Sequence, residues 1–260
     1  MKKYISLIKC SLLNQLQYRV NFILSLIGIL IPFVINFVFW KAVYSNSPDT
    51  VLYGYTYQQM IQYVIATNLI GLITNINFAN SVSADIHSGY LSTLLIKPFH
   101  YIPYKMLNQL GGSFLQIGAF IIVSAVLFYF WGVDGITALQ FYLAVILGFM
   151  VNNFLYYCIA VTSFWFTETG YLFWALQELF RIISGAIFPL TVLGTGFGIV
   201  SKFLPFQYIV YFPINIISKR VELNEYILGI GVQILWVFLL WGIAHFFWEK
   251  GLRKYIATGG

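Results

Sequence analysis

Long runs of apolar residues, separated by short polar stretches, dominate the pattern of this 260-residue sequence. A bilayer core of about 30 Å needs roughly 20 apolar residues in a helix. Six runs meet that requirement: Asn21–Trp40, Gln59–Asn80, Gly111–Trp131, Ala138–Trp165, Tyr171–Leu193 and Tyr226–Trp248. The pattern predicts an all-α, polytopic membrane protein, with six transmembrane helices in a single domain over residues 1–260.

The composition excludes a water-soluble protein. Hydrophobic residues make up 60% of the chain and charged residues only 8%, and the mean hydropathy is +0.83. A typical soluble domain is about 25% charged. A single soluble core also stops growing near this chain length, so it cannot hide so much apolar surface. A soluble enzyme, a disordered chain and a secreted disulfide scaffold are therefore excluded.

The distribution of Lys and Arg predicts the orientation of the chain. If the N-terminus is cytoplasmic, the cytoplasmic segments hold nine Lys and Arg against three acids, whereas the outer segments hold four of each. Cytoplasmic loops of membrane proteins carry such an excess of positive charge. We therefore expect both termini in the cytoplasm. The positive charges form no basic face with stacking aromatics, so nucleic acid is not an expected partner.

The first 20 residues have the pattern of an amphipathic helix that lies on the inner membrane surface. Such a helix buries its apolar stripe and binds anionic head groups through its basic side chains. The apolar and basic positions of this interface helix are Ile5, Ile8, Leu12 and Lys2, Lys3, Lys9. The pattern favours a simple membrane anchor, and an elbow helix that also contacts a cytoplasmic partner is the alternative.

The longest cytoplasmic loop, residues 83–106, contains a short amphipathic pattern. Its apolar positions at helical spacing are Ile86, Tyr90, Leu94 and Leu95. We predict one helix that ends at Pro98, because proline pushes the preceding residue out of the helical region. A short apolar face beside the membrane suits docking onto another protein. Asp85 and His87 have no further ligands nearby, so a docking surface is a better interpretation than a metal site.

Residues 194–223 are apolar but are interrupted by Pro205 and Pro213. Neither piece is long enough to cross a bilayer. Irregular backbone at membrane depth requires burial in protein or contact with water. We therefore predict a re-entrant hairpin that enters from the outer side between the fifth and sixth spans.

Two charged residues, Glu178 and Arg181, lie three positions apart inside the fifth apolar run. Intramembrane charges are costly and usually pair with each other or face a cavity. The pair is either a local contact that fixes helix packing or part of a gate or substrate path. Asparagines in the second run, such as Asn68 and Asn75, are more often hydrogen-bonding contacts between helices.

Catalytic, nucleotide-binding and metal-binding motifs are absent from the sequence. It contains no GxxxxGK[ST] loop to hold ATP phosphates, and no HExxH or GxSxG motif. Cys10 and Cys158 lack the spacing of a metal site or a disulfide framework. Nothing in the pattern predicts covalent chemistry.

The sequence resembles the membrane subunits of ABC-2-type exporters over its whole length. DIHSGYLSTLLIKP (Asp85–Pro98) is similar to the coupling segment that follows span two in that family. GAIFPLTVL (Gly185–Leu193), followed by LPF and YFPI, is similar to the family's proline-marked entry into extracellular re-entrant helices. The tail WEKGLRKYIATGG (Trp248–Gly260) is a third similarity.

This resemblance implies an export permease in the bacterial cytoplasmic membrane that moves an amphipathic or lipid-like substrate. It implies no catalytic residue, metal or cofactor in this chain, because a cytoplasmic ATPase dimer would bind ATP and Mg²⁺. A second permease, identical or a sister subunit, and membrane lipids would be the other partners. The interface helix would then touch the ATPase. The resemblance assigns coupling to Asp85, Ile86, His87, Gly89, Tyr90, Leu91, Leu94 and Leu95, and the substrate path to Asn68, Asn75, Glu178 and Arg181.

Two other functions fit a polytopic membrane protein. One is a stand-alone secondary carrier or channel, in which the Glu178–Arg181 pair couples transport to an ion or proton. The other is a membrane scaffold whose cytoplasmic loop docks a signalling partner.

Overall fold

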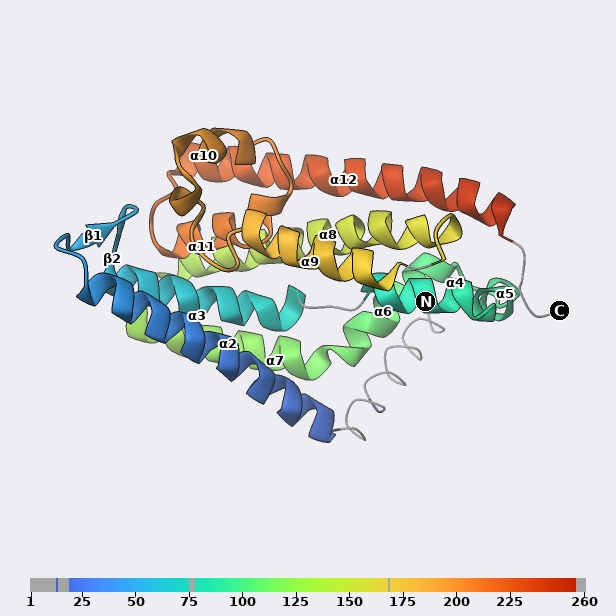
Figure 1. Cartoon of the computed structure of the whole chain (residues 1–260), viewed down its shortest axis with the longest axis horizontal. Coiled ribbons are helices and arrows are strands. Elements are labelled where there is room, and N and C mark those ends of the chain that lie inside the picture. The colour runs from blue at the N-terminus through green and yellow to red at the C-terminus, as the bar shows by residue number, and fades with distance from the viewer. Residues whose placement is uncertain (1–12, 14–18, 75–77, 168, 256–260) are drawn as a thin grey trace.

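A computed structural model describes residue 13 and residues 19–74, 78–167 and 169–255. The predicted interface helix, with Lys2, Lys3, Ile5, Ile8, Lys9 and Leu12, lies outside the described residues. Within the described part, the chain is a bundle of helices whose long axis runs horizontally in Figure 1. A small antiparallel hairpin, β1 (Val51–Leu52) and β2 (Tyr55–Thr56), marks one end, which we call the hairpin end.

Five long helices form the body of the bundle: α2 (Arg19–Ser45), α3 (Tyr57–Thr74), α7 (Phe114–Trp131), α8 (Gly135–Val161) and α12 (Leu223–Lys254). They coincide with five of the six predicted apolar runs. Among the described residues, four stretches are long and apolar enough to cross a membrane, namely Tyr57–His87, Phe114–Trp131, Gly135–Phe164 and Leu223–Lys254. These correspond to the second, third, fourth and sixth predicted spans, whereas the total of six stays a prediction.

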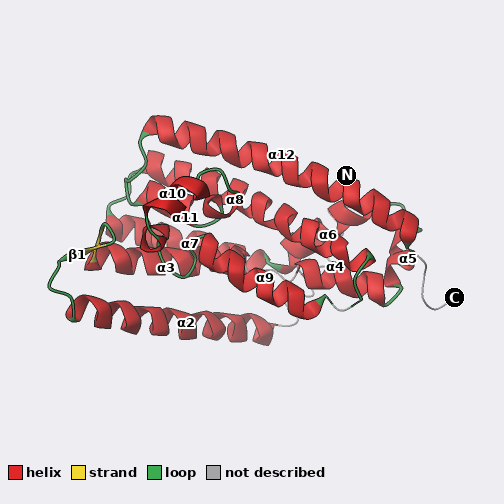
Figure 2. Cartoon of the chain, turned by 45° about the horizontal axis from the view of Figure 1, so that its top comes forward, coloured by secondary structure: helices red, strands yellow, loops and turns green. Residues whose placement is uncertain are grey.

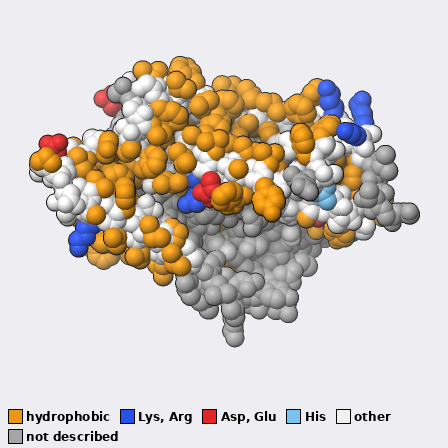
Figure 3. Space-filling model, viewed as in Figure 1, with side chains coloured by type: hydrophobic (Ala, Val, Ile, Leu, Met, Phe, Trp, Pro, Cys, Tyr) orange, Lys and Arg blue, Asp and Glu red, His pale blue; other side chains and the backbone are white. Residues whose placement is uncertain are grey.

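Helix α8 lies at the centre of the bundle, with α12 packed along it, whereas α2 packs mainly against α3. About 67% of its apolar window is buried, against 17% for α7 and 22% for α12. Figure 2 shows α12 and α2 along opposite edges. Their exposed side chains are mainly apolar, and Figure 3 shows hydrophobic side chains over most of the described part of one face. Apolar surface on this scale fits burial in lipid.

The opposite end of the bundle carries three shorter helices, α4 (Phe78–His87), α5 (Tyr90–Leu95) and α6 (Tyr101–Gly112), and we call it the α5 end. The prediction of a single helix from Ile86 to Leu95 is wrong. The chain breaks at Gly89, whose φ of +75° is a left-handed conformation that glycine adopts without steric cost. Helices α4 and α5 are therefore separate elements.

The fifth predicted run, Tyr171–Leu193, is helical only in its first half. Helix α9 (Gly170–Ile183) has 14 residues, about 21 Å at the helical rise, which is less than a bilayer core. It ends because Gly185 takes a φ of +82° and Pro189 follows soon after. The next residues form a 3₁₀ turn, Leu190–Leu193, in place of the expected helix.

Residues 184–222 fold back into the bundle beside α8. They contain α10 (Thr195–Ser201), a 3₁₀ turn (Phe206–Tyr208) and α11 (Tyr211–Ile217). The segment leaves at the hairpin end, where Lys219 pairs with Asp134 at the start of α8, with 3.4 Å between Nζ and Oδ1. Inside the bundle, the backbone of Tyr208 and Ile209 packs against Gly148 of α8. Gly148 is 14 residues beyond Asp134, so the segment reaches roughly 21 Å into the bundle.

Buried polar side chains satisfy the irregular backbone of this segment. Gln233 of α12 is fully buried, and its Nε2 donates to the carbonyl oxygens of Ala144 and Tyr208 at 2.8 and 2.9 Å. The Tyr63 hydroxyl donates to the carbonyl of Gly185, and the Tyr211 N–H donates to the carbonyl of Ser184. Each bond removes the penalty of a buried, unpaired backbone group.

Candidate functional site

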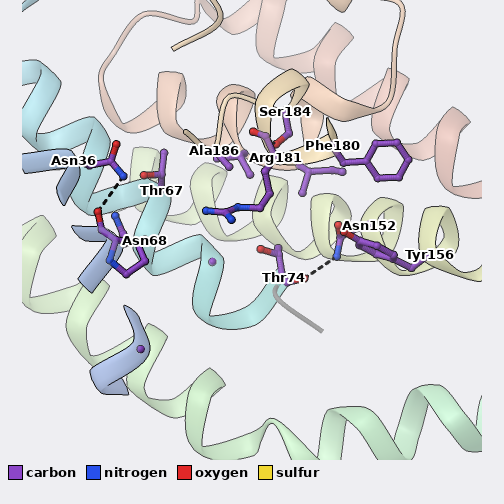
Figure 4. A pocket seen from close by; sticks show the side chains of 15 residues that line it. Asn36, Thr67, Asn68, Thr74, Asn152, Tyr156, Phe180, Arg181, Ser184 and Ala186 are labelled. Atoms are coloured by element: carbon purple, nitrogen blue, oxygen red, sulfur yellow. Dashed lines mark hydrogen bonds between the residues drawn. The ribbon is translucent and has the colours of Figure 1, made fainter. Parts of the chain in front are cut away.

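A polar cavity of about 170 Å³ lies inside the bundle, between α2, α3, α8 and α9. Figure 4 shows Arg181 extending towards Thr67 and Asn68, with Thr74 and Asn152 joined by a hydrogen bond beside them. Its polar lining comes from Asn36, Thr67, Asn68, Thr74, Asn152, Tyr156, Arg181 and Ser184. A wider hollow of about 470 Å³ at the hairpin end is lined by Lys202, Arg220 and Glu225 among others, but it lacks this convergence of polar groups from four helices.

The asparagines of the cavity are held by hydrogen bonds from their amide nitrogens. Nδ2 of Asn36 donates to the carbonyl of Pro32, and Nδ2 of Asn68 donates to the carbonyl of Val64, at 3.0 and 2.8 Å. Both acceptors lie four residues earlier in the same helix. Asn152 instead donates across the bundle, from α8 to the carbonyl of Thr74 at 3.1 Å. Because only the amide nitrogen can donate, each side chain leaves its carbonyl oxygen available.

Arg181 extends from α9 into the cavity (Figure 4). Its Nη1 donates to both carboxylate oxygens of Glu178, at 2.9 and 3.1 Å. The pairing predicted from the sequence is thus present, with 38% of the Arg181 side chain and 37% of the Glu178 side chain exposed. Exposed ion pairs of this kind contribute little to stability. A role in helix packing alone therefore explains the presence of this pair poorly.

The cavity brings together only some of the residues assigned to a substrate path. Asn68 and Arg181 both line it, whereas Glu178 reaches it only through Arg181. Asn75 lies outside the described residues. Sequence reasoning did not assign Asn36, Thr67, Asn152 or Ser184 to a site. The available signal was the presence of polar side chains in apolar runs, but which of these face one another depends on helix rotation.

The α5 end holds a buried charged network around Asp85. Lys105 Nζ lies 2.6 Å from Asp85 Oδ2, and each side chain is 12% exposed. The Tyr101 hydroxyl donates to the same carboxylate oxygen at 2.6 Å. Burial, and then this hydrogen bond, raise the pKa of Tyr101 above its ordinary value. The network joins α4 to α6, so Asp85 has a structural contact in addition to its predicted coupling role.

The apolar residues assigned to coupling divide into a buried set and an exposed set. Ile86, Leu91 and Leu94 are buried, whereas Tyr90 and Leu95 are 48% and 42% exposed. Ile96, which was not assigned, is 85% exposed. His87 is exposed at the end of α4, and the described residues contain no group of three His, Cys, Asp or Glu that could hold a metal. Within α5 and the residue that follows it, the exposed apolar side chains are Tyr90, Leu95 and Ile96.

Helix α12 packs directly onto the α5 end. The Trp248 ring stacks on Tyr101 at a centroid distance of 5.0 Å. Gly251 lies so close to Phe164 that a Cβ there would be 2.1 Å from the ring. The Tyr255 hydroxyl also forms a hydrogen bond of 3.2 Å with Ser92 in α5. α12 therefore contacts the shorter helices at one end and, through Gln233, the folded-back segment at mid-bundle.

Residues 30–259 match the protein family described as ABC-2 family transporter protein. The chain belongs to this family. A search of curated proteins and a search of solved structures each gave no significant match. The family and the apolar helices identify the ABC-2 protein as a membrane transport component that is not itself catalytic. ABC-2 permeases usually work with an ATPase partner.

Proposed function

We propose that this ABC-2 protein is the transmembrane subunit of an ATP-driven exporter that moves an amphipathic or lipid-like substrate outward. The observation that carries the proposal is the family match over residues 30–259, together with the projecting apolar surface at the α5 end. The chain lacks a phosphate-binding loop, so a separate ATPase dimer would bind ATP and Mg²⁺.

The proposed orientation places the α5 end in the cytoplasm of a bacterium and the hairpin end outside. Lys97, Lys105, Lys250, Arg253 and Lys254 then lie on the cytoplasmic side, as the positive-inside rule requires. Six spans result if α9 and the irregular residues that follow it together count as the fifth. Both termini, and the interface helix, would then be cytoplasmic.

In this orientation, residues 194–223 form a re-entrant hairpin from the outer side. Backbone that is not helical is tolerated at membrane depth only when protein or water satisfies it. Gln233, Tyr63 and the Tyr211 N–H provide that satisfaction here. The hairpin then acts as an outer plug above the cavity, because Ile209 and Val210 line the cavity wall.

The exposed surface formed by Tyr90, Leu95 and Ile96 would bind to the ATPase. Burying apolar side chains of this exposure releases the water around them and is the main driving force of such contacts. Asp85, Ile86, Leu91 and Leu94 would support that surface from beneath, and His87 and Gly89 flank it. A second permease would complete the path, with lipid around the remaining apolar faces.

ATP binding would displace the α5 end, and α12 provides a route for that displacement into the membrane. Its 32 residues form a rod of about 48 Å. Trp248 and Gly251 fix one part of the rod to the α5 end, and Gln233 fixes another to the carbonyl of Tyr208 in the plug. Gln233 also donates to the carbonyl of Ala144 in α8, so a shift of the rod would act on the plug and on α8 together.

Copurification with an ABC-type ATPase from the native host tests this function. We expect the ATPase to remain bound to the wild type and to be lost from a Leu95→Asp, Ile96→Asp double variant. Phe203→Asp is the matched control, since Phe203 is 76% exposed but follows α10 near the other end. Copurification that is unchanged in the double variant would contradict docking at this surface.

A secondary carrier or channel is the second candidate, and the half-exposed Glu178–Arg181 pair beside the cavity favours it. In that case, liposomes containing only this chain would move solute along a proton gradient. Export by the ATPase-containing complex, with no transport by the chain alone, would exclude this candidate.

A further inference from the structure

The polar groups of the cavity are divided by chemistry as well as by position. On the α2, α3 and α8 walls, the carbonyl oxygens of Asn36, Asn68 and Asn152 make no hydrogen bond within the described part of the chain. The hydroxyls of Thr67 and Thr74 donate to backbone carbonyls of their own helix, so they too offer only lone pairs. Apart from the Tyr156 hydroxyl of α8, which can donate or accept, the polar groups of these three walls therefore present acceptors.

The α9 wall presents donors. Arg181 uses Nη1 for Glu178, and its Nη2 and Nε have no hydrogen-bond partner among the described residues. Because Glu178 balances the charge of Arg181, the pair adds no net charge to the cavity. The remaining N–H groups of a guanidinium fork suit the two oxygens of a carboxylate or phosphate.

A bare anion matches only one side of this cavity, and a bare ammonium matches only the other. Unpaired carbonyl oxygens would repel an anion that filled the space, and a lone ammonium would leave the remaining N–H groups of Arg181 without an acceptor. A group that carries both charges satisfies both sides. The volume of about 170 Å³ is close to that of apolar cavities that hold a six-carbon ring.

We propose that the cavity binds a small zwitterionic group, with a primary ammonium facing Asn36, Asn68 and Asn152 and a carboxylate or phosphate facing Arg181. This deepens the proposed function, and rests on it, by giving the chemical class that the substrate carries. The same chemistry occurs in a free amino acid and in an aminoalkyl phosphate lipid head group.

Binding to the purified full-length chain, without the ATPase or ATP, tests the proposal. The probes are 3-aminopropionate, propylammonium and propionate, which share a three-carbon chain and differ in charge. Nanodiscs of phosphatidylglycerol avoid a competing ammonium from the lipid. Thermal stabilisation and saturation-transfer NMR measure binding, and the NMR signal does not depend on the stability of a variant.

We expect 3-aminopropionate to bind at least about tenfold more tightly than either singly charged probe, since hydrogen bonds to charged groups carry that magnitude. Asn36→Leu and Asn68→Leu should each weaken it by roughly tenfold. Asn46→Leu is the matched control, because Asn46 makes the same bond to a carbonyl four residues earlier but does not line the cavity. It should leave binding unchanged.

Three results would overturn the proposal. If propionate binds as tightly as 3-aminopropionate, the asparagine oxygens take no part in binding. If propylammonium binds as tightly as 3-aminopropionate, Arg181 takes no part in binding. Absence of binding by all three probes would mean that the cavity holds only water. Adding phosphatidylethanolamine to the nanodiscs distinguishes a lipid head group from a soluble substrate. If the lipid competes with 3-aminopropionate, the zwitterionic group belongs to a lipid head group. If it does not compete, the group belongs to a soluble substrate. Export failing while binding persists would refute the transport function alone.

Discussion

The contact between Gly148 and the folded-back segment is a sharp test of how the chain enters the bundle. A Cβ on Gly148 would lie 2.7 Å from the carbonyl oxygen of Tyr208 and 3.3 Å from the Cα of Ile209. That carbonyl also accepts a hydrogen bond from Gln233, which restricts its movement. Gly148→Ala therefore forces the backbone of α8 and the backbone of residues 208–209 apart, because the atoms in contact are backbone atoms that cannot turn away as a flexible side chain could.

The expected loss follows from two opposing effects. Overpacking of this kind costs about 1–3 kcal/mol, and the backbone contact argues for the upper half of that range. Replacing glycine by alanine inside a helix returns about 1 kcal/mol. The net loss of unfolding free energy is then about 1–2 kcal/mol, which corresponds to a fall in melting temperature of about 2–8 °C for a chain of this size.

Thermal unfolding of the purified full-length protein, followed by tryptophan fluorescence, measures this loss. Gly118→Ala in α7 is the matched control, because no atom lies within 4 Å of its Cβ position. The control should gain about 1 kcal/mol. If both variants are equally stabilised, residues 208–209 do not lie against α8 and the folded-back segment is wrongly placed.

Three further predictions concern single polar groups. Gln233→Leu leaves the buried carbonyl of Tyr208 without its side-chain donor and should cost about 1–3 kcal/mol in chemical unfolding; a neutral effect would contradict the proposed support of the plug. Lys105→Met should cost about 3 kcal/mol by leaving Asp85 buried and unpaired, and Asp85→Asn in the same chain should recover most of it unless the pair is uncoupled. The N–H of Thr137 lowers the pKa of Asp134 from 3.8 to about 2. The stability that ionised Asp134 contributes is therefore complete above about pH 4 and is lost as the pH falls towards 2. The difference in melting temperature between wild type and Asp134→Asn should narrow over that range. A constant difference would refute this linkage.

The sequence predicts the long helices well because a membrane span needs only length and apolar composition. Helices α8 and α12 fall on their predicted runs with small differences at the ends. The breaks are harder to predict, because a glycine in an apolar run is compatible with either a helix or a turn. Gly89 and Gly185 take left-handed conformations, and each shortens an expected helix.

The candidate site could be predicted only in part, since it depends on which helix faces meet. The spacing of Glu178 and Arg181 predicted their ion pair, because residues three apart share a helix face. Asn36, Asn68 and Asn152 line one cavity but come from three different helices, of which α8 is distant in the sequence from α2 and α3. Periodicity also could not show that Leu94 is buried while Leu95 is exposed, because that depends on packing around α5.

The side of the membrane on which α5 lies is the central claim that can be measured most directly. Ile96 is 85% exposed, so Ile96→Cys can be labelled in a chain whose Cys10 and Cys158 have been replaced by alanine. In cells that express this chain without the ATPase, a maleimide that cannot cross membranes should label inverted vesicles and leave intact spheroplasts unlabelled. Labelling of intact spheroplasts, without labelling of inverted vesicles, would place α5 outside the cell and contradict coupling to a cytoplasmic ATPase.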